Sequence, residues 1–453
     1  MPCTIPHALD RIKGNLAHYL PTALVLSICR DLGRDYRERT LTPLATTLLF
    51  VQQVLHGNCA CGLLRHLSGL DFTDSAYCQA RGRLPFGFFQ RLLTAVTGRC
   101  RRLDPADATE LWHGHRVFLL DGSSFSMPDT PELRAEFGQP GAQADGCGFP
   151  VAHLLVLFDA STGYLLRAIP APLRTHDLAH AALTHPDLAA GDVLAGDRAF
   201  GSYAHLALLH GRGLHGLFRA HQKTLIDFRP GRPYVPPGGS ARGQKGVPRS
   251  RWLKRLGKDD QVVEYHKPKE CPAWLTAAQY AALPDTLVVR ELRYPVRTPG
   301  GRVRQVTLVT TLLSRRRYPA RALARLYARR WQAEVNLRHL KEAMQMDVLR
   351  CKTFVGVLKE LTVFVAVYNL VRRVMRQAAQ RQGVQVDRVS FTDALRWLFA
   401  SRAGDELPRL KVNPERPGRV EPRVRKRRPK QYPLMRKPRA VLRKALLDQL
   451  PAP

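Results

Sequence analysis

The chain has 453 residues, 45% of them hydrophobic, and its 71 lysine and arginine residues exceed its 37 aspartate and glutamate residues, for a formal net charge of +34. This length excludes a single small domain and indicates about three structural units of roughly 150 residues each. Because such an excess of positive charge repels itself in a compact protein, it predicts a polyanionic partner, and we expect nucleic acid.

Membrane and secretory signals are not evident in the sequence. No apolar run approaches the roughly 20 residues that a spanning helix needs, so we expect no membrane partner. The opening MPCTIPHALDRIKGNLAHYL lacks the cationic and apolar blocks of a secretory signal. Nine cysteines, an odd number spread from Cys3 to Cys351, do not suggest a disulfide framework. A cytoplasmic protein is therefore expected.

Residues 1–110 are predicted to form a helical domain. Apolar residues recur at helical spacing in LTPLATTLLFVQQVLHG and in FGFFQRLLTAVTGRC. Pro21, Pro43 and Pro85 each stand near the start of such a run, where proline is tolerated in the first turn of a helix.

A zinc site is conceivable within this domain, from His56, Cys59, Cys61 and His66. The single residue between the two cysteines is a tighter spacing than that of paired ligands in structural zinc sites. Free cysteine is also among the most buried residue types. Buried thiols are therefore the favoured interpretation.

Residues 111–220 are predicted to be the first part of an α/β domain. Short apolar runs, RVFLLDG, VAHLLVLFD, GYLLRAIPA, DVLAGD and LHGLFRAH, have the length and composition of buried strands. HDLAHAALTHPDL and SYAHLALLHGRG lie between the later runs and are helical in pattern. Such alternation predicts a sheet covered by helices.

Residues 221–315 are expected to be a β-rich insertion into this domain. The segment RPGRPYVPPGGSARGQKGVPRS is too rich in turn residues to pack a core and is predicted to be a mobile loop. Strand-like QVVEYHK, LVVRELRYPV and RVRQVTLVTTLL follow it. The α/β domain resumes over 316–400 with a long helix from about 319 to 346 and another in FVGVLKELTVFVAVYNLVRRVMRQAA. Residues 401–453, which include RVEPRVRKRRPKQYPLMRKPR, are predicted to be a basic tail.

Two aspartates stand where strands are expected to end, Asp121 after VFLL and Asp197 after VLAG. Ligands collect at this edge of an α/β sheet. A lone aspartate in such a place is more often a helix cap or a turn former. Two of them, together with a glutamate on a nearby helix, favour a metal site instead.

That glutamate is Glu334, in LYARRWQAEVNLRHLKEAM. On an ideal helix of 100° per residue, Arg330, Glu334 and Lys341 fall at about −60°, −20° and −40° from Tyr327, so the four side chains share one face. An adjoining apolar stripe would hold this face at the border of the core, and it consists of Leu326, Ala333, Leu337, Leu340 and Met344.

The spacing Y-x2-R-x3-E-x6-K over these residues resembles the signature of the insertion-sequence-four family of bacterial DDE transposases. Asp121 in LLDGS and Asp197 in GDRAFGSY are similar to the first and second aspartates of that family. The resemblance covers residues from about 115 to 350. It implies an α/β, RNase H-like catalytic core interrupted by a β-rich insertion, with a helical N-terminal domain and a basic C-terminal tail.

The resemblance also implies chemistry and partners. Asp121, Asp197 and Glu334 would be catalytic and would hold two Mg2+ ions, with Mn2+ able to substitute; Mg2+ is a hard cation that prefers oxygen ligands. Basic and aromatic residues nearby would bind DNA phosphates: Tyr327, Arg330, Lys341, Arg198 and Arg338. The partners would be double-stranded DNA, both element ends and target, and a second copy of the chain in a synaptic homodimer.

Other residues compete for these roles. Asp159 ends VLFD and Glu342 follows Lys341, but the family pattern selects neither, and aspartate is common in hairpin turns. Trp252 and Trp274 in the insertion could stack a flipped base, although core packing is the favoured role for each.

The leading hypothesis is a cut-and-paste DNA transposase that cleaves the ends of an insertion sequence and joins them to target DNA. The helical domain at 1–110 and the tail at 401–453 would bind the terminal inverted repeats. Two alternatives remain open: an inactive or domesticated DNA-binding architectural protein, and a metal-dependent nuclease without joining activity.

Overall fold

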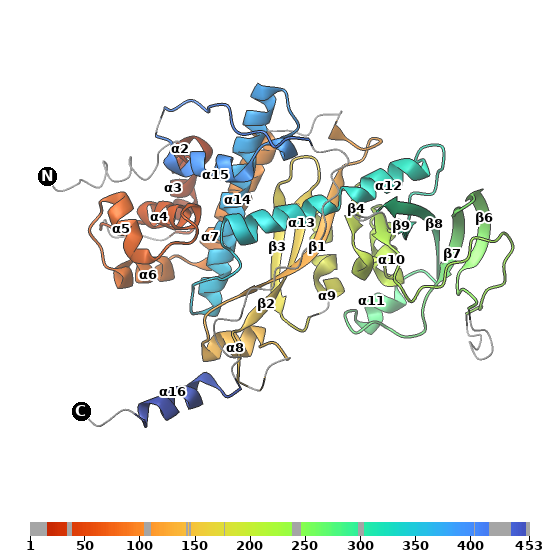
Figure 1. Cartoon of the computed structure of the whole chain (residues 1–453), viewed down its shortest axis with the longest axis horizontal. Coiled ribbons are helices and arrows are strands. Elements are labelled where there is room, and N and C mark those ends of the chain that lie inside the picture. The colour runs from red at the N-terminus through yellow and green to blue at the C-terminus, as the bar shows by residue number, and fades with distance from the viewer. Residues whose placement is uncertain are drawn as a thin grey trace.

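The computed structural model describes residues 16–449 except for 34–38, 104–109, 142–143, 145, 176, 238–245, 298–302, 403 and 416–435. Figure 1 shows helices from the N-terminal third at one end of the molecule, a sheet in the middle and further strands at the other end. Most of the basic tail sequence and the centre of the predicted mobile loop lie outside the described residues.

The N-terminal third is helical over its described residues. Threonine side chains cap two of these helices, Thr42 by accepting from Ala45 N–H and Thr73 by accepting from Ala76 N–H. Pro21, Pro43 and Pro85 stand at or directly before helix starts, as predicted. The helices are α2 (Leu16–Tyr19), α3 (Thr22–Asp31), α4 (Pro43–Leu55), α5 (Cys61–Ser68), α6 (Asp74–Arg83) and α7 (Phe86–Leu103).

A mixed sheet follows. Its first three strands pair antiparallel in the order β3-β2-β1, and β4 and β5 continue beyond β1 as parallel neighbours. The strands expected in this region are confirmed as β1 (Val117–Ser126), β2 (Val151–Asp159), β3 (Leu165–Pro172), β4 (Val193–Gly196) and β5 (His215–Arg219). The intervening helices are α8 (Pro131–Phe137), α9 (Asp177–Ala181), η2 (Ala182–Asp187), η3 (Arg198–Phe200) and α10 (Tyr203–Gly211).

The strands between β5 and the later helices extend this same sheet. β9 pairs antiparallel with β5 through Leu217↔Thr310, so the described residues form one nine-stranded sheet ordered β3-β2-β1-β4-β5-β9-β8-β7-β6. The sequence did not predict β6, an edge strand that contains three basic residues and has no apolar alternation. The elements are β6 (Arg251–Gly257), β7 (Asp260–His266), α11 (Ala277–Ala281), β8 (Thr286–Arg297) and β9 (Val303–Thr310).

The two faces of the sheet carry separate apolar cores. Val117 and Leu119 of β1 face the larger core, which continues into the N-terminal helices, whereas Phe118 and Leu120 face a smaller core with α10. This alternation is the period of two expected of a strand. The larger core is centred on α14 (Phe354–Gln382), which packs against α4, α7, α15 (Phe391–Ala400) and β3.

By length and composition, α14 is apolar enough to cross a membrane, contrary to our expectation that no segment would be. Its most apolar window is 72% buried within the protein, as in the central helix of a packed core. Thr353 caps its start and Gly383, in the left-handed conformation, ends it.

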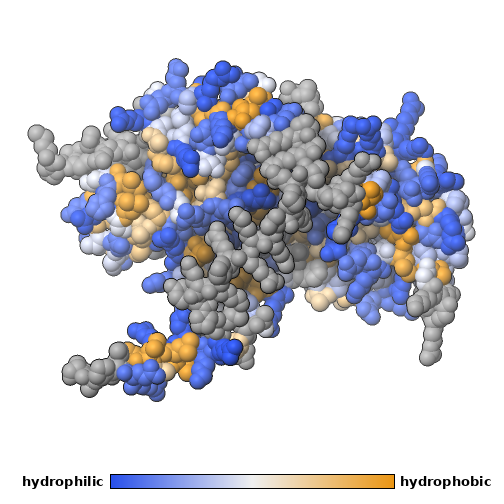
Figure 2. All heavy atoms as spheres, in the orientation of Figure 1, coloured by the Kyte–Doolittle hydropathy of each residue, from blue (hydrophilic) through white to orange (hydrophobic). Residues whose placement is uncertain are grey.

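The chain ends in a helix that stands apart from the body. α16 (Arg439–Leu447) exposes apolar side chains, among them Leu446 at 65%, and Figure 2 shows hydrophobic and hydrophilic residues side by side on this helix. Its start contacts the body of the protein: Arg439 lies over the Phe149 ring at 4.3 Å and 3.8 Å from the Asp129 carboxylate.

Candidate active site

Asp121 lies within β1, not at its end. The expectation of a strand end at Asp121 was wrong because β1 continues to Ser126, held by antiparallel pairing with β2 as far as Ser126↔Val151. What ends at this point is the pairing between β1 and β4, whose last partners are Leu120 and Gly196. Asp121 is thus the first residue of β1 beyond its parallel neighbour.

Asp197 follows the last residue of β4, as predicted. Its Oδ1 accepts the Ala199 N–H at 2.7 Å and so caps the short helix η3. Since Leu120 pairs with Gly196, the next residues along the two parallel strands, Asp121 and Asp197, are neighbours at the same edge. By strand alternation both belong to the face that carries Val117 and Leu119.

The long helix predicted over 319–346 is divided into three parts, so that expectation was wrong. α12 (Ala320–Ala328) and α13 (Trp331–Arg338) are separated by a tightened turn, in which Gln332 N–H bonds to Arg329 O and Ala333 N–H to Arg330 O, three residues back. A wide turn, η4 (His339–Ala343), follows, where Met344 N–H reaches back five residues to His339 O. Such departures from the α-helical ladder are frequent at functional sites.

The apolar stripe predicted along this segment is nevertheless buried, with Ala333 and Leu340 each at 0% exposure. α13 packs on β1, on the face of the sheet that carries Asp121. Glu334 is therefore brought to the aspartates by packing of its own helix, and its side chain keeps 34% exposure.

Arg330 lies between two of the three carboxylates. Its Nη2 donates to Glu334 Oε1 at 2.6 Å, and its Nη1 is 3.9 Å from Asp121 Oδ2. Burial raises the pKa of Asp121 to about 6, with Glu334 and Asp197 adding to the rise and Arg330 opposing it. Burial also raises the pKa of Tyr327; the Arg330 guanidinium, which donates toward the Tyr327 hydroxyl oxygen, opposes this rise, and the negative charge of Asp197 adds to it. The three carboxylates, Arg330 and Tyr327 thus form one electrostatic cluster.

Cavities border this cluster on both sides. One of about 360 Å³ is lined by Asp121, Glu334, Arg338 and Lys341, together with Glu342 and Asp347. The other, of about 790 Å³, extends from Asp197 and Arg198 to β7. The structure therefore places the predicted phosphate-binding residues in two groups, with Arg338 and Lys341 beside Glu334 and Arg198 beside Asp197.

Sequence reasoning missed a partner of Lys341. Its Nζ is 2.9 Å from the Asp347 carboxylate, which is 62% exposed. Asp347 lies beyond the wide turn η4, and the helical arithmetic assumed an unbroken helix through this region, so it contained no signal for the pair. Arg198 donates to Gln222 Oε1 at 2.8 Å, another contact that the sequence did not indicate.

Of the residues that compete for these roles, Asp159 lies away from the cluster, whereas Glu342 lines the same cavity as Glu334. Asp159 is buried at the far end of the β1–β2 pairing, where its carboxylate binds Arg116 at 2.7 Å and the following turn. Glu342 is exposed and lines the smaller cavity. Trp274 packs against the smaller core, whereas the buried indole N–H of Trp252 has no partner among the described residues.

The cysteines and histidines considered for zinc make other contacts. Cys61 Sγ lies 4.0 Å from Cys78 Sγ, and Cys59 is buried. The His56 ring approaches Gln52 O at 2.9 Å and packs on Phe399. In the part of the chain that the structure describes, no group of three or more His, Cys, Asp or Glu side chains is already close enough to hold a metal ion.

The acidic cluster nevertheless fits a divalent cation in its chemistry. Three carboxylates supply hard oxygen donors. Burial raises the pKa of Asp121, and repulsion from Glu334 and Asp197 adds to the rise; a nearby cation would relieve both effects. In this arrangement the Arg330 guanidinium provides the positive charge between Asp121 and Glu334.

Comparison with known proteins identifies the family. Residues 112–370, more than half of the chain, match the family model described as "Transposase DDE domain". The chain belongs to this family. It is a DNA transposase, an enzyme that cleaves DNA and transfers strands, and members of this family depend on divalent metal ions. The matched region includes Asp121, Asp197 and Glu334.

Two relatives from Escherichia coli strain K12 are similar to this transposase. "Transposase InsG for insertion sequence element IS4" is 25% identical over 378 residues, which are 79% of this chain and 78% of the relative. "Putative transposase InsZ" is 37% identical over 75 residues, 16% of this chain and 25% of the relative. The family and the first relative support a transposase of the IS4 type.

Among solved structures, a piggyBac transposase synaptic complex with hairpin DNA aligns with a TM-score of 0.41 and 10% sequence identity. The alignment covers 88% of this chain and 79% of that chain.

Proposed function

We propose that Asp121, Asp197 and Glu334 are the catalytic carboxylates of this transposase and hold two Mg2+ ions. The observation that carries the proposal is the register Leu120↔Gly196, which makes the two aspartates neighbours on the face against which the helix of Glu334 packs. When bound, such ions activate a water or a 3′-hydroxyl and stabilise the leaving oxygen of an in-line displacement.

The surrounding cations suit the DNA backbone. Arg330 reaches two of the carboxylates, Lys341 and Arg338 line the cavity beside Glu334, and Arg198 borders the cavity beside Asp197. A guanidinium can bind a phosphate through two parallel hydrogen bonds, and an ammonium binds it as a point charge. We assign these residues, with Tyr327, to holding phosphates next to the bond that is cut.

We further propose that the core is RNase H-like and that the enzyme belongs to the branch with the Tyr-Arg-Glu-Lys signature. The order β3-β2-β1-β4-β5, with an antiparallel meander followed by parallel strands, supports the fold assignment. Tyr327, Arg330 and Glu334 lie in one electrostatic cluster, which supports the branch assignment. β6–β9 would be the insertion into this core.

The binding of element ends is assigned to the regions flanking the core. The N-terminal helices and the basic sequence beyond residue 401 would contact the terminal inverted repeats, for which the formal net charge of +34 provides the attraction. Cleavage at two ends of an element would take place in a synaptic homodimer.

The test replaces each carboxylate without changing its shape. Asp121→Asn, Asp197→Asn and Glu334→Gln should each abolish Mg2+-dependent cleavage of end DNA, while the dissociation constant for that DNA changes little. Glu342→Gln is the matched control, because Glu342 lines the same cavity as Glu334 and should tolerate the change.

Full cleavage activity in any of the three variants would refute the corresponding assignment. A second assay offers precleaved ends together with target plasmid. Joined products identify strand transfer at this site, and their absence from an enzyme that still cleaves would point to a nuclease.

A further inference from the structure

The turn between α12 and α13 has no local cause in the sequence. Kinks in helices arise at proline, at glycine or where other groups interfere with the hydrogen-bond ladder, and the segment ARALARLYARRWQAEVNLR contains neither proline nor glycine. The turn at Arg329 and Arg330 therefore has to be held by contacts from outside the helix. It falls between Tyr327 and Glu334, so its geometry sets the direction of both Arg330 and Glu334.

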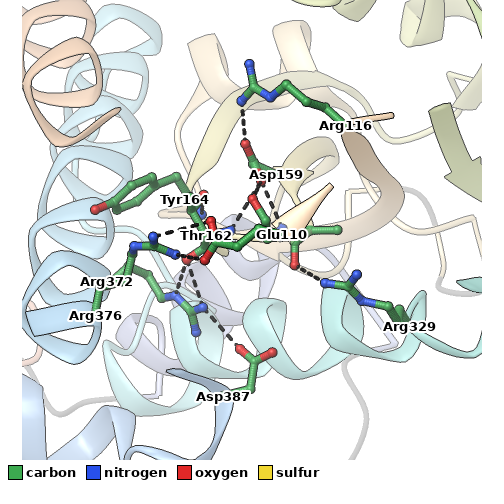
Figure 3. A network of polar contacts seen from close by, with 11 residues as sticks. Glu110, Arg116, Asp159, Thr162, Tyr164, Arg329, Arg372, Arg376 and Asp387 are labelled. Carbon is green, nitrogen blue, oxygen red and sulfur yellow. Dashed lines mark hydrogen bonds and ion pairs between the residues drawn. The ribbon is translucent and has the colours of Figure 1, made fainter. Parts of the chain in front are cut away.

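One such contact comes from the turn between β2 and β3. Arg329 Nη2 donates to Ala160 O at 2.7 Å. That turn is itself rigid, because the buried Asp159 carboxylate accepts Ser161 N–H at 2.9 Å and Thr162 N–H at 3.2 Å, and it also binds Arg116 (Figure 3). Asp159, a rival candidate for catalysis by sequence, is instead the residue that shapes this turn.

A second contact reaches the same turn by another route. Gln332 Nε2 donates to Asp387 Oδ2 at 2.5 Å, and Asp387 Oδ1 is 3.1 Å from Arg372 Nη2. Arg372, on α14 and only 1% exposed, donates in turn to Thr162 O at 2.9 Å (Figure 3). The turn is closely fitted to Arg372, since a Cβ added at Gly163 would lie 2.0 Å from Nη2.

We propose that Arg329 and Gln332 are positioning residues, which fix the break between α12 and α13 by fastening it to the β2–β3 turn. Through the break they aim Arg330 and Glu334 at Asp121. The inference rests on the catalytic role assigned to Glu334. Its physical basis is that a displacement of about 1 Å at a catalytic group can cost about 100-fold in rate, so the supporting hydrogen bonds carry part of the catalytic effect.

The experiment compares three changes in the full-length transposase. Arg329→Ala and Gln332→Ala each remove one fastening, and Arg329→Lys retains a donor that can still reach the Ala160 carbonyl. Arg325→Ala is the matched control, since it removes the same charge one turn earlier on α12, where Arg325 is exposed and has no ion pair among the described residues.

Single-turnover cleavage of end DNA is measured at several Mg2+ concentrations, alongside the dissociation constant for the DNA and the melting temperature. Arg329→Ala should slow cleavage by about 10- to 100-fold and raise the Mg2+ concentration needed for half-maximal rate. DNA affinity should stay within about twofold of the parent, because the Arg329 guanidinium is committed to a carbonyl. Arg329→Lys should restore part of the rate, and Arg325→Ala should cleave at the parental rate.

Cleavage at the parental rate by both alanine variants, with unchanged Mg2+ dependence, would overturn the proposal, as would an equal loss in Arg325→Ala. If Arg329→Ala fails to fold, Gln332→Ala and Arg329→Lys decide by the same criteria. Glu334→Gln, measured in parallel, separates the two inferences. If Glu334→Gln still cleaves DNA, the assigned active site is wrong. If Glu334→Gln is inactive while the Arg329 and Gln332 variants are fully active, only the positioning role of Arg329 and Gln332 is refuted.

Discussion

Asp260→Asn should weaken the attachment of the β6–β9 strands to the segment that leads into α12. Arg290 on β8 is completely buried, and its Nε and Nη2 donate to the two oxygens of Asp260 at 2.7 and 2.6 Å. Its Nη1 donates to Tyr318 O at 2.7 Å, just before α12 begins. The substitution leaves the Arg290 cation buried without a compensating charge.

The magnitude follows from burial. Breaking a buried ion pair by removing one partner costs about 3–5 kcal/mol. With an unfolding entropy of about 2.1 cal/mol/K per residue, a chain of 453 residues loses roughly 1 °C of Tm for each 1 kcal/mol. The expected decrease is therefore about 3–5 °C if the protein unfolds as one unit.

Glu264→Gln provides the control within the same strands. Glu264 on β7 pairs with Arg251 at 3.1 Å, but the Arg251 side chain is 48% exposed. Exposed pairs contribute about 0–1 kcal/mol, so the Tm should fall by no more than about 1 °C. Calorimetry on both variants checks the comparison, and equal Tm values for Asp260→Asn and Glu264→Gln would refute the reasoning.

Three further predictions follow from buried polar groups. Glu360→Ala should lower the free energy of unfolding by about 3 kcal/mol or more, measured with urea. The substitution leaves three N–H donors without their acceptor, namely the Asn58 side chain and the backbone amides of Arg350 and Cys351. A loss below about 1 kcal/mol would contradict this. Gly163→Ala should lower Tm, since Gly163 has φ +71 and its new Cβ would meet Arg372; an unchanged Tm would show that the turn can move. Tm should also fall from pH 7 to pH 5, because burial lowers the pKa of His185 to about 3 and of His205 to about 4 from 6.5. Between pH 7 and pH 5 these two histidines take up protons in the unfolded chain but not in the folded one, which favours unfolding. If this pair is responsible, His185→Gln should make Tm depend less steeply on pH.

Much of this molecule could be predicted from local patterns. The apolar runs that became β1, β2, β4 and β5 were recognisable because a buried strand needs little more than several apolar residues between turn formers. The buried stripe from Leu326 to Met344 was also predictable, even though the helix beneath it is broken, since hydrophobic periodicity reports which side chains face the core. The spacing of Tyr327, Arg330, Glu334 and Lys341, together with the two aspartates Asp121 and Asp197, indicated a DDE transposase, and the family match confirms that family.

What the sequence could not determine depends on partners far along the chain. β1 runs past Asp121 because β2 continues to supply hydrogen bonds, and the strands of the expected insertion join the main sheet because β9 pairs with β5. The helix breaks after Ala328 where Arg329 meets the Ala160 carbonyl, 169 positions away. Local propensity reports which residues prefer a strand or a helix and which side is buried. The end of each element, and with it the direction of the side chains that we propose to be catalytic, is set by hydrogen-bond partners that only the folded chain brings together.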